Sequence, residues 1–183
     1  MGQIASKTQL RMSFLRWAMV VVPLLLLLGF LSGRSVPVGA QNHWYVALEK
    51  PAIMPPDWVF PVAWSILYVL IALALAIVLN ARGARRRGIA LALFVVQFAL
   101  NLAWTPIFFA QHRIDLALAV VAAMLAAGTA TTLAFGRVRS TAAWLMVPYL
   151  VWVGFAGVLT WRIGQLNPGA ATLVPAQHTT QML

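Results

Sequence analysis

The sequence predicts an all-α integral membrane protein, a bundle of five transmembrane helices in a single domain. Hydrophobic residues make up 62% of its 183 residues and charged residues only 9%, whereas a soluble domain needs a more charged surface. Five apolar stretches each approach the roughly 20 residues that span a bilayer. They are continuously apolar and do not alternate with polar residues, which excludes the strands of a transmembrane barrel.

The five spans are predicted from the ends of these stretches. We place them at residues 14–32, 59–80, 89–109, 116–135 and 142–163 of a domain covering 14–163. Residues 1–13 then form a cytoplasmic N-terminal segment, and 164–183 a polar tail that we expect to be disordered. The first span has an alternative interpretation as a cleaved signal peptide, because basic residues precede it and small residues follow it at 38–40.

The net charge of +10 lies in the loops and at the ends of the spans. Nine of the thirteen basic residues fall on one side of the predicted membrane: Lys7, Arg11, Arg16, Arg82, Arg85, Arg86, Arg87, Arg137 and Arg139. The positive-inside rule makes that side cytoplasmic, with the C-terminus outside, as in a bacterial cell membrane. We therefore expect no nucleic-acid partner. The chain has no cysteine, which excludes disulfides and thiolate metal sites.

The connection between the first two spans, residues 33–58, is long and rich in proline and aromatic residues, which is typical of a lid. Its prolines restrict φ, so the loop can hold one shape without regular hydrogen bonds. The candidate lid residues are His43, Trp44, Lys50, Pro51, Pro55, Pro56 and Trp58. The two tryptophans have an alternative role as anchors at headgroup level.

Polar and aromatic residues recur on single faces of three spans. Gln97, Asn101 and Trp104 follow one another at i, i+4 and i+7 in the third span. An unpartnered amide in hydrocarbon costs several kcal/mol, so this face must point into the bundle. Its amides either bond to another helix or face a cavity where a ligand supplies the partner. The rings expected around that cavity are Trp64, Tyr68, Tyr149 and Trp152.

The fourth span carries alanines every four residues, at 119, 123 and 127 and at 122, 126, 130 and 134. Such small faces permit close contact between helices. Asp115 stands at the predicted start of this span, where we expect it to be the N-cap.

Taken together, these motifs resemble the TspO/translocator protein family, also called tryptophan-rich sensory proteins or peripheral-type benzodiazepine receptors. The resemblance rests on Trp44-Tyr45, on Lys50-Pro51, on QFALNLAWTPIFF at 97–109, and on VPYL at 147–150 with Trp152. Their order and spacing match the family from about Trp44 to Trp161, and five spans is the family's number.

The resemblance implies a homodimeric bundle that binds porphyrins such as protoporphyrin IX or haem, and in some members cholesterol or benzodiazepine-type ligands. Its partners would be porphyrin or another hydrophobic small molecule and membrane lipid, with no obligatory cofactor and no metal site. By similarity, the ligand-binding residues are Trp44, Trp64, Tyr68, Asn101, Trp104, Tyr149, Trp152 and Ala156, to which the burial argument adds Gln97.

Three positions depart from the family pattern. Ile53 stands where the lid loop usually carries a tryptophan, and Thr160 where the last span often carries an asparagine. Tyr149 has no basic residue after it until Arg162, so the sterol motif is incomplete. We therefore expect weaker porphyrin photochemistry and no sterol recognition through this motif.

The function that the sequence favours is tetrapyrrole binding, with a sensory, regulatory or transport role, and with His43 and Lys50 as the lid cations nearest to the propionates. One alternative is facilitated transport of hydrophobic molecules, although no inverted repeat or buried carboxylate indicates alternating access. Another is light-dependent porphyrin degradation. The sequence shows no nucleophile–base pair, metal cluster or paired carboxylates, so we assign no catalytic residue.

Overall fold

The computed structural model describes residues 7–170 and 173, and these contain helices and no strand. The five long helices are α1 (Lys7–Arg34), α3 (Val59–Asn80), α4 (Arg87–Phe109), α5 (Ile114–Val138) and α6 (Ser140–Leu166). Two short elements, η1 (Gly39–Gln41) and α2 (His43–Ala47), lie in the loop after α1. Each long helix is long and apolar enough to cross a membrane, which confirms the predicted five-span all-α fold.

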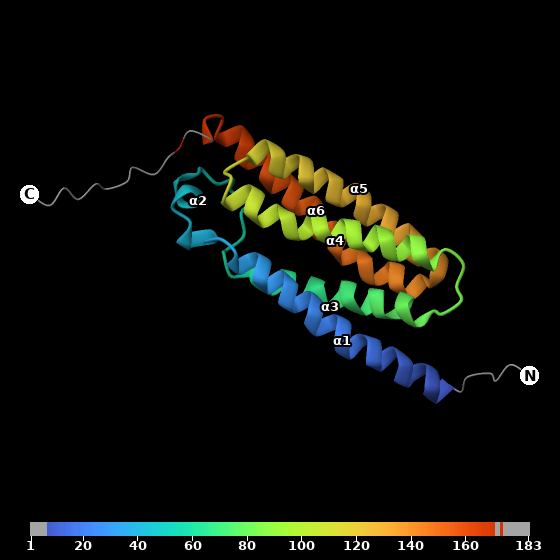
Figure 1. Cartoon of the computed structure of the whole chain (residues 1–183). Helices are drawn as coiled ribbons and strands as arrows, with labels where there is room; N and C mark the ends of the chain where they lie inside the picture. Colours follow the sequence, from blue (N-terminus) through green and yellow to red (C-terminus); the bar gives the residue numbers. More distant parts are fainter. Residues whose placement is uncertain (1–6, 171–172, 174–183) are drawn as a thin grey trace, which may run out of the picture.

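The long helices pack in the order α1, α3, α6, α5, α4, and α1 also touches α4 (Figure 1). The α2 element lies at one end of the bundle, and the loop between α3 and α4 lies at the other. Most of the core is one cluster of buried apolar side chains contributed by all five helices. This ring of helices surrounds the inward faces of α3, α4 and α6, on which the candidate site lies.

A proline in α4 creates the contact between α1 and α4. Pro106 has no N–H, so the carbonyl of Leu102, four residues earlier, lacks its helical donor. The hydroxyl of Ser32 in α1 donates to this carbonyl at 2.9 Å. The hydrogen bond that the proline removes within α4 is therefore replaced by one between two helices.

The close approach of α5 to α6 does not use the alanine rows. Ala119, Ala122, Ala123 and Ala126 are exposed in the single chain. The two helices meet instead at Gly128, where an added Cβ would lie 2.9 Å from Leu150 and 3.1 Å from Tyr149. Of the two alanine rows, only Ala134 is buried in the core, so whether the exposed alanines make a close helix contact stays a prediction.

Three predicted boundaries need correction. The N-cap residue of α5 is Arg113, and Asp115 lies exposed within the first turn, where its charge can still interact favourably with the helix dipole. Residues 7–13 already belong to α1. The tail was predicted to be disordered from 164, but α6 continues to Leu166 and residues 167–170 pack against the lid; the rest of the tail, except 173, lies outside the described residues.

Charge separates along the bundle axis. The acidic residues Glu49, Asp57 and Asp115 all lie at the lid end. The arginines of the α3–α4 loop and of the α5–α6 turn lie at the opposite end. One of these, Arg87, donates to the last carbonyls of α3, to Val78 at 3.1 Å and Leu79 at 2.9 Å, so it also caps a helix.

Candidate functional site

The polar face predicted in the third span points into the bundle. Gln97 and Asn101 are buried, with 0% and 5% of their surfaces exposed. The Tyr68 hydroxyl of α3 donates to Oδ1 of Asn101 at 2.8 Å, and Tyr149 of α6 is fully buried in the core cluster against which Tyr68 packs. Side chains of α3 and α4 therefore meet at one amide inside the bundle, and a buried tyrosine of α6 lies in the same core.

Several polar atoms around this amide are buried without a hydrogen-bond partner among the described residues. They are both amide atoms of Gln97, Nδ2 of Asn101, the indole nitrogens of Trp104 and Trp152, and the hydroxyl of Tyr149. Each buried unsatisfied group costs about 1–3 kcal/mol, and native structures contain few of them. Six such atoms on five residues that face one region mark a polar site within an apolar bundle.

Aromatic rings surround these polar atoms. Trp64 lies 5.6 Å from Tyr68 between ring centroids, and Tyr68 lies edge-on to Phe98 at 6.0 Å. Trp152 packs between Phe60 at 6.0 Å and Phe155 at 5.6 Å. Ring faces together with a few convergent polar groups are the usual lining of a site for a flat organic ligand.

Trp44 of the lid is buried but does not join this group directly. Its ring stacks on His112 at 4.5 Å and meets Phe108 edge-on at 5.4 Å, and its indole nitrogen donates to the carbonyl of Ala170 at 2.8 Å. Phe108 in turn stacks on Trp104 at 5.0 Å. Phe108 therefore links the lid tryptophan to Trp104, which packs against the same cluster of buried residues.

Two asparagines fasten the lid to the bundle. Asn42 caps α2 by accepting from the N–H of Tyr45, and its amide donates to the carbonyl of Phe109 at the end of α4. Asn167, just after α6, accepts from the N–H of Glu49 at 2.8 Å and donates to the carbonyl of the same residue at 2.9 Å. Together with the bond from Trp44 to Ala170, the lid is therefore attached to α4 through Asn42 and to the segment after α6 through Asn167 and Ala170.

Lys50 stabilises the lid from within. Its ammonium donates to the carbonyls of Tyr45, Val46 and Leu48 at 2.9, 3.3 and 3.1 Å and lies 4.7 Å from the centre of the Tyr45 ring. Burial raises the pKa of Tyr45, and the nearby Asp57 carboxylate raises it further. Lys50 thus stabilises the C-terminal turn of α2. The sequence had predicted no regular element in this segment of the loop.

Comparison with known proteins agrees with this architecture. The sequence model of the TspO/MBR family matches residues 19–166. The chain belongs to the TspO/MBR family. It is 42% identical over 147 residues to a tryptophan-rich sensory protein of Cereibacter sphaeroides, covering 78% of this chain and 91% of that protein. It is 37% identical over 139 residues to protein CrtK of Rhodobacter capsulatus, covering 75% and 87%, and 34% identical over 144 residues to the human translocator protein, covering 78% and 85%.

In this TspO/MBR protein, the predicted site residues fall into two groups. Those inside the bundle are buried or pack against the main core cluster: Trp64, Tyr68, Gln97, Asn101, Trp104, Tyr149 and Trp152, with Ala156 half-buried one turn beyond Trp152. The lid residues do not join them. His43, Pro56 and Trp58 are exposed, Pro51 and Pro55 are half-buried at the lid surface, and Lys50 binds loop carbonyls.

The structure adds residues that the sequence analysis did not select. Phe60 and Phe98 complete the aromatic surround, and His112 stacks on the lid tryptophan. Asn42 and Asn167 hold the lid. Only Asn42 carried a local signal, because asparagine directly before a short helical segment is a common N-cap.

Proposed function

We propose that this TspO/MBR family membrane protein binds a tetrapyrrole of the porphyrin or haem type between α3, α4 and α6. The observation that supports the proposal is the group of six buried polar atoms that have no hydrogen-bond partner in the described part of the chain, among tryptophan, tyrosine and phenylalanine rings. An apolar ligand would leave these atoms unsatisfied. A wide, flat ring with polar atoms at its centre and edge suits both features.

The energetics favour such a ligand. Stacking against an aromatic side chain contributes about 0.5–1.5 kcal/mol per pair beyond the buried area. Each orphaned group that gains a hydrogen bond recovers part of a penalty of about 1–3 kcal/mol. Trp64, Tyr68 and Trp152 would supply ring faces, whereas Gln97 and Asn101 would supply amide donors and acceptors.

Entry of the ligand requires some opening of the lid. Lys50 cannot pair with a propionate without releasing the three carbonyls that it now holds, so exposed His43 is the lid group available for that contact. The tetrapyrrole would supply light absorption when bound, and the protein residues supply stacking, hydrogen bonding and exclusion of water.

The test is a titration of the full chain in lipid nanodiscs with protoporphyrin IX, followed by its absorbance shift. Saturable binding of one equivalent, weakened at least several-fold by Asn101→Ala and by Trp152→Phe, is the expected result. Trp144→Phe is the matched control, because Trp144 is 74% exposed near the far end of α6. Linear partitioning that ignores all three substitutions would show that the interior does not hold this ligand.

Movement of the ligand across the membrane is the second candidate. The mammalian relatives are named translocator proteins, and the site lies inside a ring of helices that spans the bilayer. Sealed liposomes loaded with an acceptor would separate the two functions. A binder takes up one equivalent and stops, whereas a carrier delivers ligand to the lumen continuously.

We also propose that the chain forms a homodimer in a bacterial cell membrane with its N-terminus cytoplasmic. The orientation is supported by the positive end of the bundle. Because the chain has no cysteine, a single one introduced at Arg85 or at Ala52 reports each end independently. An impermeant thiol reagent added to intact cells should label only the Ala52 position, and the opposite pattern would reverse the orientation.

A further inference from the structure

We infer that an open groove between the lid and α6 binds the headgroup of a zwitterionic phospholipid, phosphatidylethanolamine, with its phosphate at Arg162 and its ammonium at Glu49. This site lies outside the aromatic interior, and the inference does not depend on the tetrapyrrole proposal.

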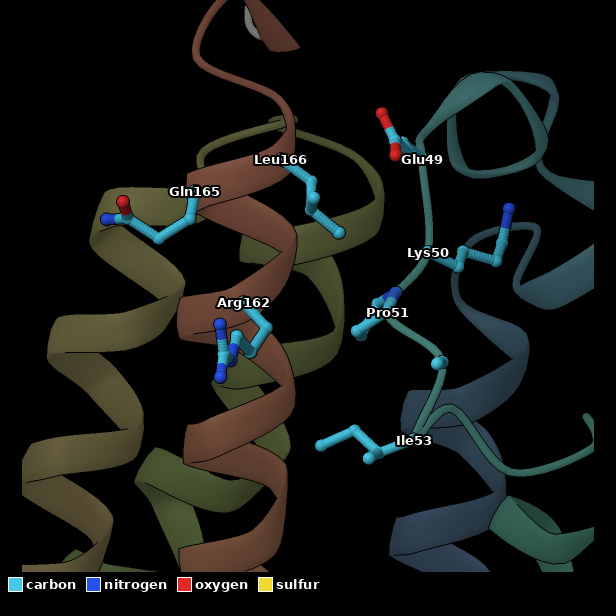
Figure 2. Close-up of a pocket in the computed structure, with 8 residues that line it drawn as sticks. Glu49, Lys50, Pro51, Ile53, Arg162, Gln165 and Leu166 are labelled. Atoms are coloured by element: carbon cyan, nitrogen blue, oxygen red, sulfur yellow. The ribbon is translucent and has the colours of Figure 1, made fainter.

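The groove runs between the lid segment 49–53 and the last turns of α6 and has a volume of about 400 Å³. Its walls are largely apolar. Figure 2 shows Pro51 and Ile53 pointing from the lid towards α6, and Leu166 pointing from α6 towards the lid. Such a volume is at the lower end of the range for small-molecule sites, about 300–1,000 Å³.

Two opposite charges line this groove without pairing. Glu49 contacts Asn167 only through its backbone, which leaves its carboxylate without an ion pair in the part of the chain that is described. The Arg162 guanidinium lies over the Trp161 ring at 5.1 Å and makes no hydrogen bond to any described residue. Gln165 also lines the groove, although its amide points from α6 away from the lid (Figure 2). The Lys50 ammonium does not compete, because it points away from α6 and is held by loop carbonyls (Figure 2).

The depth of the groove matches the headgroup region. Trp144 and Trp161 of α6 are 74% and 46% exposed, and tryptophans on a lipid-facing surface gather at the two interfaces. They are about 26 Å apart along the helix at about 1.5 Å per residue, close to the hydrocarbon thickness of about 30 Å. Arg162, next to Trp161, therefore lies where hydrocarbon gives way to headgroups.

The order of the two charges along the membrane normal selects the ligand. Glu49 lies beside Leu166, nearer the end of α6 than Arg162 (Figure 2). In phosphatidylethanolamine the phosphate joins the glycerol, and the ammonium lies beyond it, farther from the acyl chains. Figure 2 shows the Arg162 side chain pointing away from the lid, and as an exposed side chain without a hydrogen bond to the described residues it would turn towards the groove to meet the phosphate. Phosphate at Arg162 and ammonium at Glu49 would then pair both charges at once. An anionic headgroup without an ammonium would satisfy Arg162 and leave Glu49 next to additional negative charge.

The apolar walls explain why a lipid fits better than a free phosphate compound. Pro51, Ile53 and Leu166 offer no hydrogen bonds to a small water-soluble anion, but they can cover the upper part of an acyl chain or the glycerol. The groove opens sideways between two elements at the bundle surface, which is the direction from which lipid arrives.

The experiment is native mass spectrometry of the full chain titrated with phosphatidylethanolamine and with phosphatidylglycerol. A charge-assisted hydrogen bond is worth about tenfold in affinity or slightly more, so we expect tighter binding of phosphatidylethanolamine by about that factor. Glu49→Gln should remove the preference while retaining phosphatidylglycerol binding. Arg162→Gln should weaken both lipids about tenfold.

Matched controls are Arg113→Gln and Asp115→Asn, which change the same charges at the same end of the bundle away from this groove. Neither should alter the preference between the two lipids. Equal or tighter binding of phosphatidylglycerol to the unaltered chain would overturn the assignment. The assignment would also be overturned if Glu49→Gln and Arg162→Gln left the preference between the two lipids unchanged, as the two controls should.

Discussion

Gly29→Ala tests whether α1 supports the candidate site. An added Cβ at Gly29 would overlap the Tyr68 ring, at 2.6 Å from Cζ and 2.7 Å from Cδ2. Tyr68 cannot easily move aside, because its hydroxyl is bonded to Asn101 and its ring lies beside Trp64 and Phe98. The substitution therefore forces either α1 or the Tyr68 side chain out of position.

The expected magnitude follows from two opposing effects. Alanine in place of glycine within a helix stabilises by about 0.5–1 kcal/mol. Overpacking a close contact costs about 1–3 kcal/mol, and loss of the Tyr68–Asn101 hydrogen bond costs about 1 kcal/mol more. We expect a net loss of about 1–3 kcal/mol in the free energy of unfolding.

Equilibrium unfolding of the full chain in mixed micelles measures this loss. Gly33→Ala in α1 and Gly154→Ala in α6 are controls, because nothing lies within 4 Å of a Cβ added at either position. Both controls should be as stable as the unaltered chain or slightly more stable. If Gly29→Ala matches these controls, then α1 is not packed on Tyr68 as described. A further variant, Gly29→Ala with Tyr68→Leu, should recover part of the lost stability.

Three other substitutions test single contacts. Ser32→Ala should lower the free energy of unfolding by about 1–3 kcal/mol, because the partly buried Leu102 carbonyl, which Pro106 deprives of its helical donor, loses its remaining donor. Ser35→Ala, at an exposed position, should have little effect on the same unfolding curve. Asn167→Ala should speed hydrogen exchange at the Glu49 amide, and unchanged exchange there would argue against a fastened lid. Tyr45→Phe should change the pH dependence of unfolding. Folding raises the pKa of the Tyr45 hydroxyl above its usual value near 10. The stabilising contribution of this hydroxyl is therefore full below pH 10 and is lost as pH rises through the raised pKa. The unaltered chain should therefore lose stability above pH 10 relative to Tyr45→Phe, and parallel curves would contradict this.

The interior site could be predicted because hydrocarbon leaves few choices. Gln97 and Asn101 repeat at i and i+4 in a span where an amide facing lipid would be costly, so only the inward face was available to them. Tyr68 and Trp64 lie on one face of their span for the same geometric reason. The sequence could not specify which of these groups form hydrogen bonds with each other. The bond between Tyr68 and Asn101 depends on how far α3 and α4 are shifted relative to each other along the bundle axis.

The lid could not be predicted to the same depth because its contacts are distant in sequence. Trp44 has its hydrogen-bond acceptor at Ala170, and Glu49 has its partner at Asn167. Composition showed that the loop was rigid but not where it docked. The alanine rows of α5 are limited for a related reason: small residues permit a close contact without specifying which neighbour makes it.

The proposed ligand binding and an opening of the lid would be linked through Phe108. Trp104 has an unpartnered indole nitrogen inside the bundle and stacks on Phe108, which packs edge-on against Trp44 of the lid. A ligand that draws the Trp104 indole towards itself would disturb the packing of Phe108 against Trp44. The bonds from Trp44 to Ala170 and from Asn167 to Glu49 oppose that movement, at about 1 kcal/mol each. In the ligand-free protein, polar groups in the interior are unsatisfied and the lid is held by few hydrogen bonds. A ligand that forms hydrogen bonds with these interior groups can therefore offset the free energy lost when the hydrogen bonds of the lid break.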